Sequence, residues 1–229
     1  MLKHFRASET KAFIKELYNV GQNASLVDVK KRFGDLTFNI IVRMVVGKRY
    51  FGAESNAADA EEALQCQQGI RDFFHYIGLF VVSDAFPSLE GLDLQGYEKG
   101  MKRTAKNLDS IVEGWLKEHK QKGLAADYDK AKSDQDFMDA MISMMENSKL
   151  DDYVADRIIK VTRQTNVSWD FFCSSSFVLG SGSHLLHGFE FAAPSGEPVD
   201  MTESRGLTNM KATSLEVLLS PRLPPKLYR

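Results

Sequence analysis

The stretch DLTFNIIVRMVVGKRYFG, residues 35–52, carries the clearest structural signal in the sequence. It continues an apolar stripe, with spacings of three and four, that starts a little earlier: Leu26, Val29, Phe33, Leu36 and Ile40. This periodicity predicts an amphipathic helix. Ser25 and Asp28 resemble a capping box at its start, and Gly47 is placed to end it. The stripe then widens to include Ile41, Met44 and Val45. We therefore expect this helix to be buried on more than one side.

Helices are also predicted on either side of this stretch. Residues 8–20 have helical spacing, with Ser8 as the N-cap and Gly21 as the stop. Another helix is expected to begin after Ser55 and to run to about His75. The strongest amphipathic pattern follows it as a single stripe of six residues: Met101, Ala105, Leu108, Val112, Trp115 and His119.

Residues 136–147, DFMDAMISMMEN, predict a further helix with four apolar residues on its inward face: Met138, Met141, Ile142 and Met145. A last helix is expected to start near Asp151. We interpret the methionine stripe as core packing. The alternative interpretation is an exposed face that captures a partner helix.

The character of the sequence changes near residue 165, where the helical period is lost and serine, glycine and proline become frequent. Residues 214–220, SLEVLLS, predict a short strand. The fold class is therefore mainly α with a small C-terminal β portion. We divide the chain into a helical part (1–165), a divergent junction (166–183) and a β-rich part (184–229).

Composition excludes several classes of function. The chain has 229 residues, 43% hydrophobic and 26% charged, with a formal net charge of −2. This near-neutral balance provides no general attraction for nucleic acid. No apolar run approaches the roughly 18 residues needed to span a bilayer, and the N-terminus lacks the features of a secretory signal. Cys66 and Cys173 do not suggest a disulfide framework. We expect a soluble intracellular polypeptide.

Few residues offer metal-binding or catalytic chemistry. His184 and His187 are three residues apart, with Cys173 upstream, but a structural zinc site normally needs four ligands at recognisable spacing. We interpret the two histidines as half-exposed loop residues. Cys173 would need a neighbouring base to act as a nucleophile, and an apolar thiol is the preferred interpretation. No metal site and no catalytic residue is predicted.

Several long blocks of the sequence resemble the cytochrome P-450 superfamily of haem-thiolate monooxygenases, in particular the plant microsomal type. Residues 35–52 resemble helix E and the turn after it. Residues 72–120 resemble the region from helix F through helix G, and 136–147 resemble helix H. Residues 156–162, DRIIKVT, resemble the start of the long central helix, and 187–224 resemble the C-terminal strands. The resemblance implies a partial cytochrome P-450 fold, with helices corresponding to D to H.

In that family a cysteine thiolate holds the haem iron, in a loop of pattern F-x-x-G-x-R-x-C-x-G. Along this chain Gly182 and Gly188 match the two glycines. Leu179 stands where the Phe belongs, His184 stands where the Arg belongs, and Leu186 occupies the position of the haem-ligating cysteine. The resemblance therefore identifies a remnant of the haem loop without its ligand.

By resemblance, the chain belongs with enzymes that bind haem and iron and insert oxygen into a small hydrophobic plant metabolite, supplied with electrons by a flavin reductase at the endoplasmic reticulum membrane. Residues 206–214, GLTNMKATS, would contact the substrate. The central-helix acid–threonine pair, the Glu-x-x-Arg motif and the N-terminal anchor of the family have no counterpart here. We expect a non-catalytic, internally deleted and truncated chain that does not bind haem and is cytoplasmic or degraded. The alternatives are a helical binding or interaction protein, or a product with no function.

Overall fold

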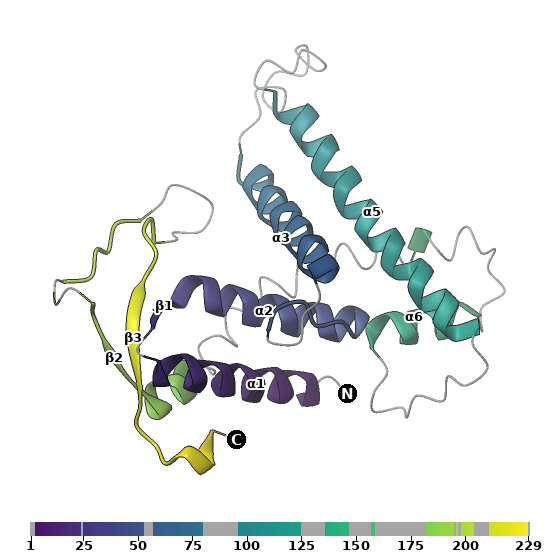
Figure 1. Ribbon diagram of the computed structural model, residues 1–229. Coiled ribbons are helices and arrows are strands. Elements are labelled where there is room, and N and C mark those ends of the chain that lie inside the picture. Colours follow the sequence, from purple (N-terminus) through teal and green to yellow (C-terminus); the bar gives the residue numbers. More distant parts are fainter. Residues whose placement is uncertain are drawn as a thin grey trace.

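The computed structural model describes residues 3–23, 25–52, 57–79, 96–124, 136–146, 157–158, 182–194, 196, 198–203 and 211–228. Residues 182–188 are helical. The named elements, in chain order, are α1 (Lys3–Gln22), β1 (Leu26–Asp28), α2 (Val29–Val46), α3 (Ala57–Ile77), α5 (Tyr97–Leu124), α6 (Phe137–Glu146), β2 (Phe189–Ala192), β3 (Glu216–Pro221) and a short 3-10 helix (Pro225–Leu227). The described residues are mainly helical with one small sheet, as predicted (Figure 1).

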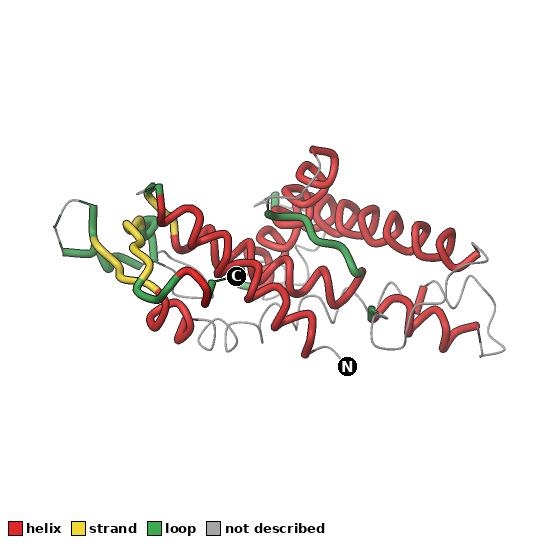
Figure 2. Tube along the Cα trace, turned by 60° about the horizontal axis from the view of Figure 1, so that its bottom comes forward, coloured by secondary structure: helices red, strands yellow, loops and turns green. Residues whose placement is uncertain are grey.

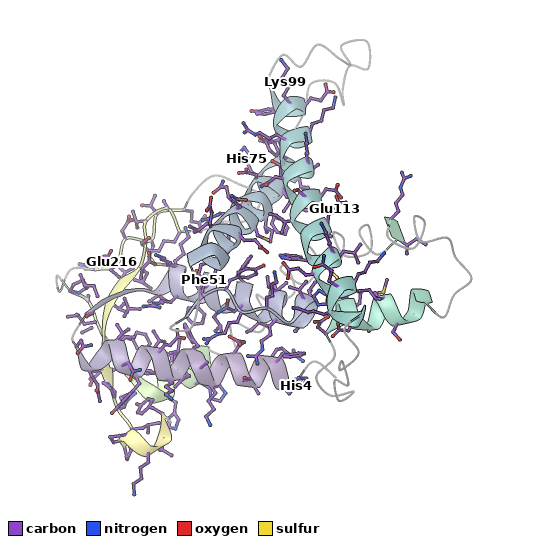
Figure 3. All side chains as sticks on the ribbon, turned by 45° about the vertical axis from the view of Figure 1, so that its right-hand side comes forward. His4, Phe51, His75, Lys99, Glu113 and Glu216 are labelled. Atoms are coloured by element: carbon purple, nitrogen blue, oxygen red, sulfur yellow. The ribbon has the colours of Figure 1, made fainter. Side chains whose placement is uncertain are left out.

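The four longer helices form two pairs, and α6 connects them. Helix α1 lies beside α2, and α3 lies beside α5, while α6 contacts both α2 and α5 (Figures 1 and 2). The ends of α3 and α5 near His75 and Lys99 project away from α1 and α2 (Figure 3). The small sheet closes the other side of the molecule, where β3 contacts α1. Helix α2 is therefore the element around which the rest of the described chain is arranged.

Two clusters of buried apolar residues explain this arrangement. Phe38, Ile41 and Val42 of α2 pack with residues of α3, α5 and α6. Leu36 and Ile40, on another side of α2, pack with residues of α1 and the sheet. The prediction that this helix is buried on more than one side is thus confirmed, because its widened stripe belongs to both clusters.

The caps of α2 follow the sequence pattern with one correction. Asp28, not Ser25, is the N-cap, and its carboxylate accepts a hydrogen bond of 3.0 Å from the backbone N–H of Lys31. Gly47 ends the helix as predicted, in a left-handed conformation with φ of 68°, and its N–H donates to the carbonyl of Arg43. Left-handed φ favours glycine because a Cβ would be strained there.

The predicted start of the N-terminal helix was wrong. Helix α1 begins at Lys3, so Ser8 lies inside it rather than capping it, and Gly21 lies in its last turn. Phe13 and Leu17 of this helix are buried as the spacing suggested. Glu9, which the sequence did not single out, is also buried, because it is paired with arginines from elsewhere in the chain.

The sheet contains a strand that the sequence analysis missed. Strand order is β1-β3-β2, and both pairings are antiparallel. Val27 pairs with Val217, and Phe191 pairs with Leu219. Residues 26–28 were predicted to be helical, but they form β1 because β3, about 190 residues away, offers a free edge. The predicted strand at 214–220 is confirmed as β3.

The turn after α2 is fixed to the helix by one buried side chain. The Asn39 carboxamide nitrogen donates to the carbonyl of Phe51 at 2.7 Å. Its oxygen accepts from the backbone N–H groups of Phe51, at 2.9 Å, and Tyr50, at 3.2 Å. This pairing satisfies backbone groups that a turn cannot satisfy by itself, and it brings Tyr50 into the core.

A polar group inside the first cluster joins α3, α5 and this turn. The indole N–H of Trp115 donates to the hydroxyl of Tyr50 at 2.8 Å and to the carboxylate of Glu62. Tyr50 also donates its hydroxyl proton to Glu62. Burial, followed by the neighbouring carboxylate of Glu62, raises the pKa of Tyr50 above its ordinary value of 10.0.

The remaining helix predictions have clear outcomes. Helices α3, α5 and α6 are confirmed. Met138 is buried, and Met141 and Ile142 pack against the same cluster, which supports the core interpretation of the methionine stripe. The expected helix from Asp151 falls mostly outside the described residues. Among the described residues, no helix combines the length and the apolar character that a membrane crossing requires.

Replacing either of two glycines in this region by alanine should change stability in opposite directions. A Cβ at Gly47 would lie 2.8 Å from Oδ2 of Asp136, whereas a Cβ at Gly34 in α2 would meet nothing within 4 Å. We expect Gly47→Ala to lower the free energy of unfolding by at least about 1–2 kcal/mol, the cost of left-handed φ alone. Gly34→Ala should raise it by about 0.5–1 kcal/mol. Urea denaturation of both variants checks this, and equal effects would contradict the assignment of strain to Gly47.

Candidate functional site

The helical segment 182–188 contains the residue at the expected position of the haem ligand. Leu185 is buried and packs with Phe189 in the cluster beneath the sheet. Leu186, one residue later, is 66% exposed. The side chain at this expected position therefore faces solvent, and a leucine has no atom that can bind iron.

The two glycines of the proposed remnant loop bound this helical segment. Gly182 is half-buried at its start, with open space where a Cβ would stand. Gly188 is buried at its end, and its carbonyl accepts a hydrogen bond from the hydroxyl of Tyr228. Residues 177–181 and Cys173 lie outside the described residues. The interpretation of this segment as a haem-loop remnant stays a prediction.

His184 and His187 are exposed on this helical segment rather than half-exposed in a loop. Their three-residue spacing places them near each other on one helical face. No third metal-ligating residue joins them among the residues that the structure describes.

Cys66 is the cysteine for which the structure gives a position. It is buried in α3 among the residues of the first core cluster. Burial, followed by the nearby carboxylate of Glu62, raises the pKa of this thiol to about 12. A thiol of this kind stays protonated at neutral pH and is a poor ligand or nucleophile. The described residues therefore do not fit a haem held by a thiolate, and no haem chemistry is assigned to them.

Because the pKa of Cys66 is raised in the folded state, the stability of the chain should fall at alkaline pH. The unfolded thiol releases its proton near the ordinary value of 9.0, while the folded thiol keeps it until about 12. The contribution of Cys66 to stability is thus complete below about pH 9 and is lost as the pH rises. We expect the difference in unfolding free energy between the native chain and Cys66→Ala to shrink by about 2 kcal/mol between about pH 8 and about pH 10.5. Urea denaturation across this range measures the difference, and a pH-independent difference would contradict it.

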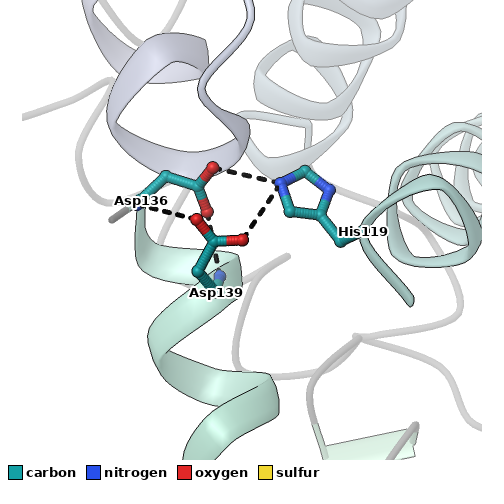
Figure 4. A group of neighbouring side chains, drawn as sticks. All are labelled: His119, Asp136 and Asp139. Carbon is teal, nitrogen blue, oxygen red and sulfur yellow. Dashed lines mark hydrogen bonds and ion pairs between the residues drawn. The ribbon is translucent and has the colours of Figure 1, made fainter. Parts of the chain in front are cut away.

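A second group of polar residues, which sequence analysis did not bring together, lies where α5 meets α6. His119 comes from the last turns of α5, Asp136 immediately precedes α6, and Asp139 lies in the first turn of α6 (Figure 4). One potential ligand atom from each of these residues lies within 4.8 Å of the others. We call these three residues the His119 cluster. Within the described part of the chain, no other set of three histidine, cysteine or carboxylate residues is gathered in this way.

Hydrogen bonds orient each member of the His119 cluster. The backbone N–H of Asp139 donates to Oδ1 of Asp136 at 2.9 Å, and the backbone N–H of Asp136 donates to Oδ2 of Asp139 at 3.3 Å. This reciprocal pair is a capping box at the start of α6. Nε2 of His119 faces the other two carboxylate oxygens, at 3.0 Å from Asp136 Oδ2 and 3.9 Å from Asp139 Oδ1 (Figure 4).

The cluster is buried and tightly packed. The side chains of His119, Asp136 and Asp139 are only 2%, 1% and 9% exposed. Asp136 also lies against Gly47 at the end of α2. The capping box was present in the sequence as DFMD and could have been recognised there. The approach of His119 could not, because it depends on how α5 packs against α6.

Comparison with known proteins identifies the family. The model of the cytochrome P450 family matches residues 2–164. Cytochrome P450 CYP82D47 of Panax ginseng is 49% identical over 168 residues, which cover 71% of this chain and 46% of that protein. Xanthotoxin 5-hydroxylase CYP82C4 of Arabidopsis thaliana is 40% identical over 228 residues, or 96% of this chain and 43% of that protein. Flavonoid-6-hydroxylase of Mentha piperita is 43% identical over 173 residues, or 72% of this chain and 32% of that protein.

These matches differ in how much of the chain they cover. The chain spans less than half the length of these relatives. The match to CYP82D47 covers 71% of this chain, which is similar in extent to the match of the family model. The match to CYP82C4 covers 96% of this chain and therefore extends past residue 164. The similarity thus includes the C-terminal part as well as the helices. Since the family model covers more than half of the residues, the chain belongs to the cytochrome P450 family.

Proposed function

We propose that this chain is a cytochrome P450 of the plant hydroxylase type that does not itself carry out oxygen insertion. The observation that carries the proposal is Leu186, an exposed leucine at the position where the resemblance places the iron-ligating cysteine. Relatives are named as hydroxylases of xanthotoxin and of flavonoids, which are small, largely hydrophobic molecules. We infer that the ancestral substrate was of this class and that its electrons came from a flavin reductase.

The chemical reason is the role of sulfur in the family. A thiolate ligand donates electron density to the haem iron and thereby favours cleavage of the O–O bond. His184 and His187 stand on either side of position 186 in the sequence and could offer imidazole nitrogens, but a neutral imidazole lacks this electron donation. A haem bound through either histidine would therefore not support monooxygenase turnover.

Haem reconstitution tests this proposal. The purified chain is titrated with haemin and then reduced under carbon monoxide, with a related plant P450 as the positive control. We expect no Soret shift of the kind that a thiolate-ligated haem gives, and no stoichiometric haem after gel filtration. A thiolate spectrum that survives Cys66→Ser but disappears in Cys173→Ser would overturn the proposal and identify Cys173 as the ligand.

One helix face considered for the alternative, a helical interaction protein, is the methionine stripe of α6. Met138 is fully buried, and Met141 packs against the core, so this face of α6 is occupied within the chain itself. Met144 is 66% exposed, but a single exposed apolar side chain is ordinary for a protein surface. We therefore do not propose a partner-binding groove on α6.

A further inference from the structure

The orientation of His119 places a proton or a cation at the centre of the His119 cluster. Nδ1 of His119 lies 2.9 Å from the carbonyl oxygen of Trp115. Because a carbonyl oxygen only accepts hydrogen bonds, Nδ1 carries a proton. Nε2 then either carries a second proton or directs a lone pair at the carboxylates of Asp136 and Asp139. A lone pair facing two anionic oxygens is repulsive, so a proton or a cation has to lie between them.

A cation fits the distances in this cluster as well as a proton does. A proton on Nε2 can be shared with Asp136 Oδ2 at 3.0 Å, but Asp139 Oδ1 at 3.9 Å is beyond hydrogen-bonding range. A zinc ion lies about 2.0–2.2 Å from nitrogen and oxygen ligands, so tetrahedral ligand atoms are about 3.3–3.5 Å apart. The distance from Nε2 to Asp136 Oδ2, 3.0 Å, is shorter than this separation, and the distance to Asp139 Oδ1, 3.9 Å, is longer. A divalent ion would also balance the charge of the two carboxylates.

The surroundings hold the three ligand atoms as metal sites commonly do. The carbonyl of Trp115 fixes the tautomer and the ring orientation of His119, as the outer partners of metal-binding histidines do. The capping box holds one oxygen of each carboxylate, and the other oxygen of each lies near Nε2. Three ligands of this kind leave a fourth position for water.

We propose that His119, Asp136 and Asp139 bind a divalent transition metal ion of the zinc class, which joins the end of α5 to the start of α6. The site involves neither haem nor residues 182–188, so it does not rest on the proposed function. It would lie between two helices whose connecting residues, 125–135, lie outside the described residues.

The test uses the full chain, free of affinity histidines, stripped with a chelator and then titrated with Zn²⁺. We expect one bound zinc per chain by elemental analysis after dialysis and a higher midpoint of thermal unfolding. Co²⁺ in place of Zn²⁺ should give the visible absorption bands of tetrahedral coordination. Asp139→Asn keeps an oxygen for the hydrogen bond from the Asp136 N–H but removes the anionic ligand. It should weaken zinc binding more than about 100-fold, since loss of an outer partner alone costs about 10–100-fold.

Controls distinguish this site from surface binding. His184 and His187 are exposed and could hold zinc adventitiously, so the double variant His184→Gln/His187→Gln should bind zinc like the native chain, and His119→Gln should not. Zinc binding that is lost in the double variant, or retained in both His119→Gln and Asp139→Asn, overturns the proposal. A chain that takes up no stoichiometric zinc also overturns the proposal. NMR that shows both nitrogens of His119 protonated would then place a proton at the centre of the cluster.

Discussion

Replacing Arg43 and Arg49 together by methionine is expected to lower the free energy of unfolding by about 3–5 kcal/mol. Arg43 binds one carboxylate oxygen of Glu9, and Nε of Arg49 donates to the other at 3.0 Å. The Glu9 side chain is 1% exposed, whereas the arginines are 31% and 25% exposed. Removing both arginines would leave a buried carboxylate without these compensating charges. The cost is high because the remaining charge cannot return to water in the folded state.

Two control variants separate charge from packing. Adding Glu9→Met to the double variant removes the stranded carboxylate and should recover most of the lost stability. Glu16→Gln, which removes the partly exposed second partner of Arg49, should cost less than about 1 kcal/mol. Denaturant unfolding measures all of these variants. If the triple variant were no more stable than the double, packing of the arginine side chains rather than charge would explain the loss.

Trp115→Ala should produce a loss of similar size, about 3–5 kcal/mol, because it empties the centre of the first core cluster. The indole is 2% exposed, and it reaches from α5 to α3 and to the turn after α2. Its N–H also satisfies Tyr50 and Glu62, so both would lose a donor in the same substitution.

Trp115→Phe keeps most of the apolar volume and removes only the N–H group. We expect an intermediate loss of about 1–3 kcal/mol, the cost of leaving a buried acceptor unsatisfied. The Tyr50→Phe change in the Trp115→Phe background should then cost little more, because the two residues share one hydrogen-bond network. Fully additive losses in this double-mutant cycle would contradict the network.

Together the described elements form a partial cytochrome P450 fold, with the family's helices gathered around α2 and a three-stranded sheet beside α1. The residues that stabilise this arrangement, Glu9 with its arginines and Trp115 with Tyr50, do not belong to segment 182–188. The chain can be tested for folding without any assumption about its cofactor.

Much of the helical structure could be predicted from periodicity alone. The stripe through residues 35–46 identified α2, its burial on two sides and its end at Gly47, because these depend on residues close together in sequence. The same local reasoning placed Ser8 at a helix start and missed β1. A good N-cap residue can lie inside a helix, and a three-residue strand exists only through its partner.

What the sequence by itself determined is the family and the positions of the long helices, since both are properties of residue order. Only the tertiary structure decided which polar residues are buried together. His119 and Asp136 are 17 residues apart and meet through the packing of α5 on α6. Glu9 meets Arg43 across α1 and α2. Such pairs leave no periodic trace in the sequence, because the free energy that buries them comes from packing between helices rather than from any single segment.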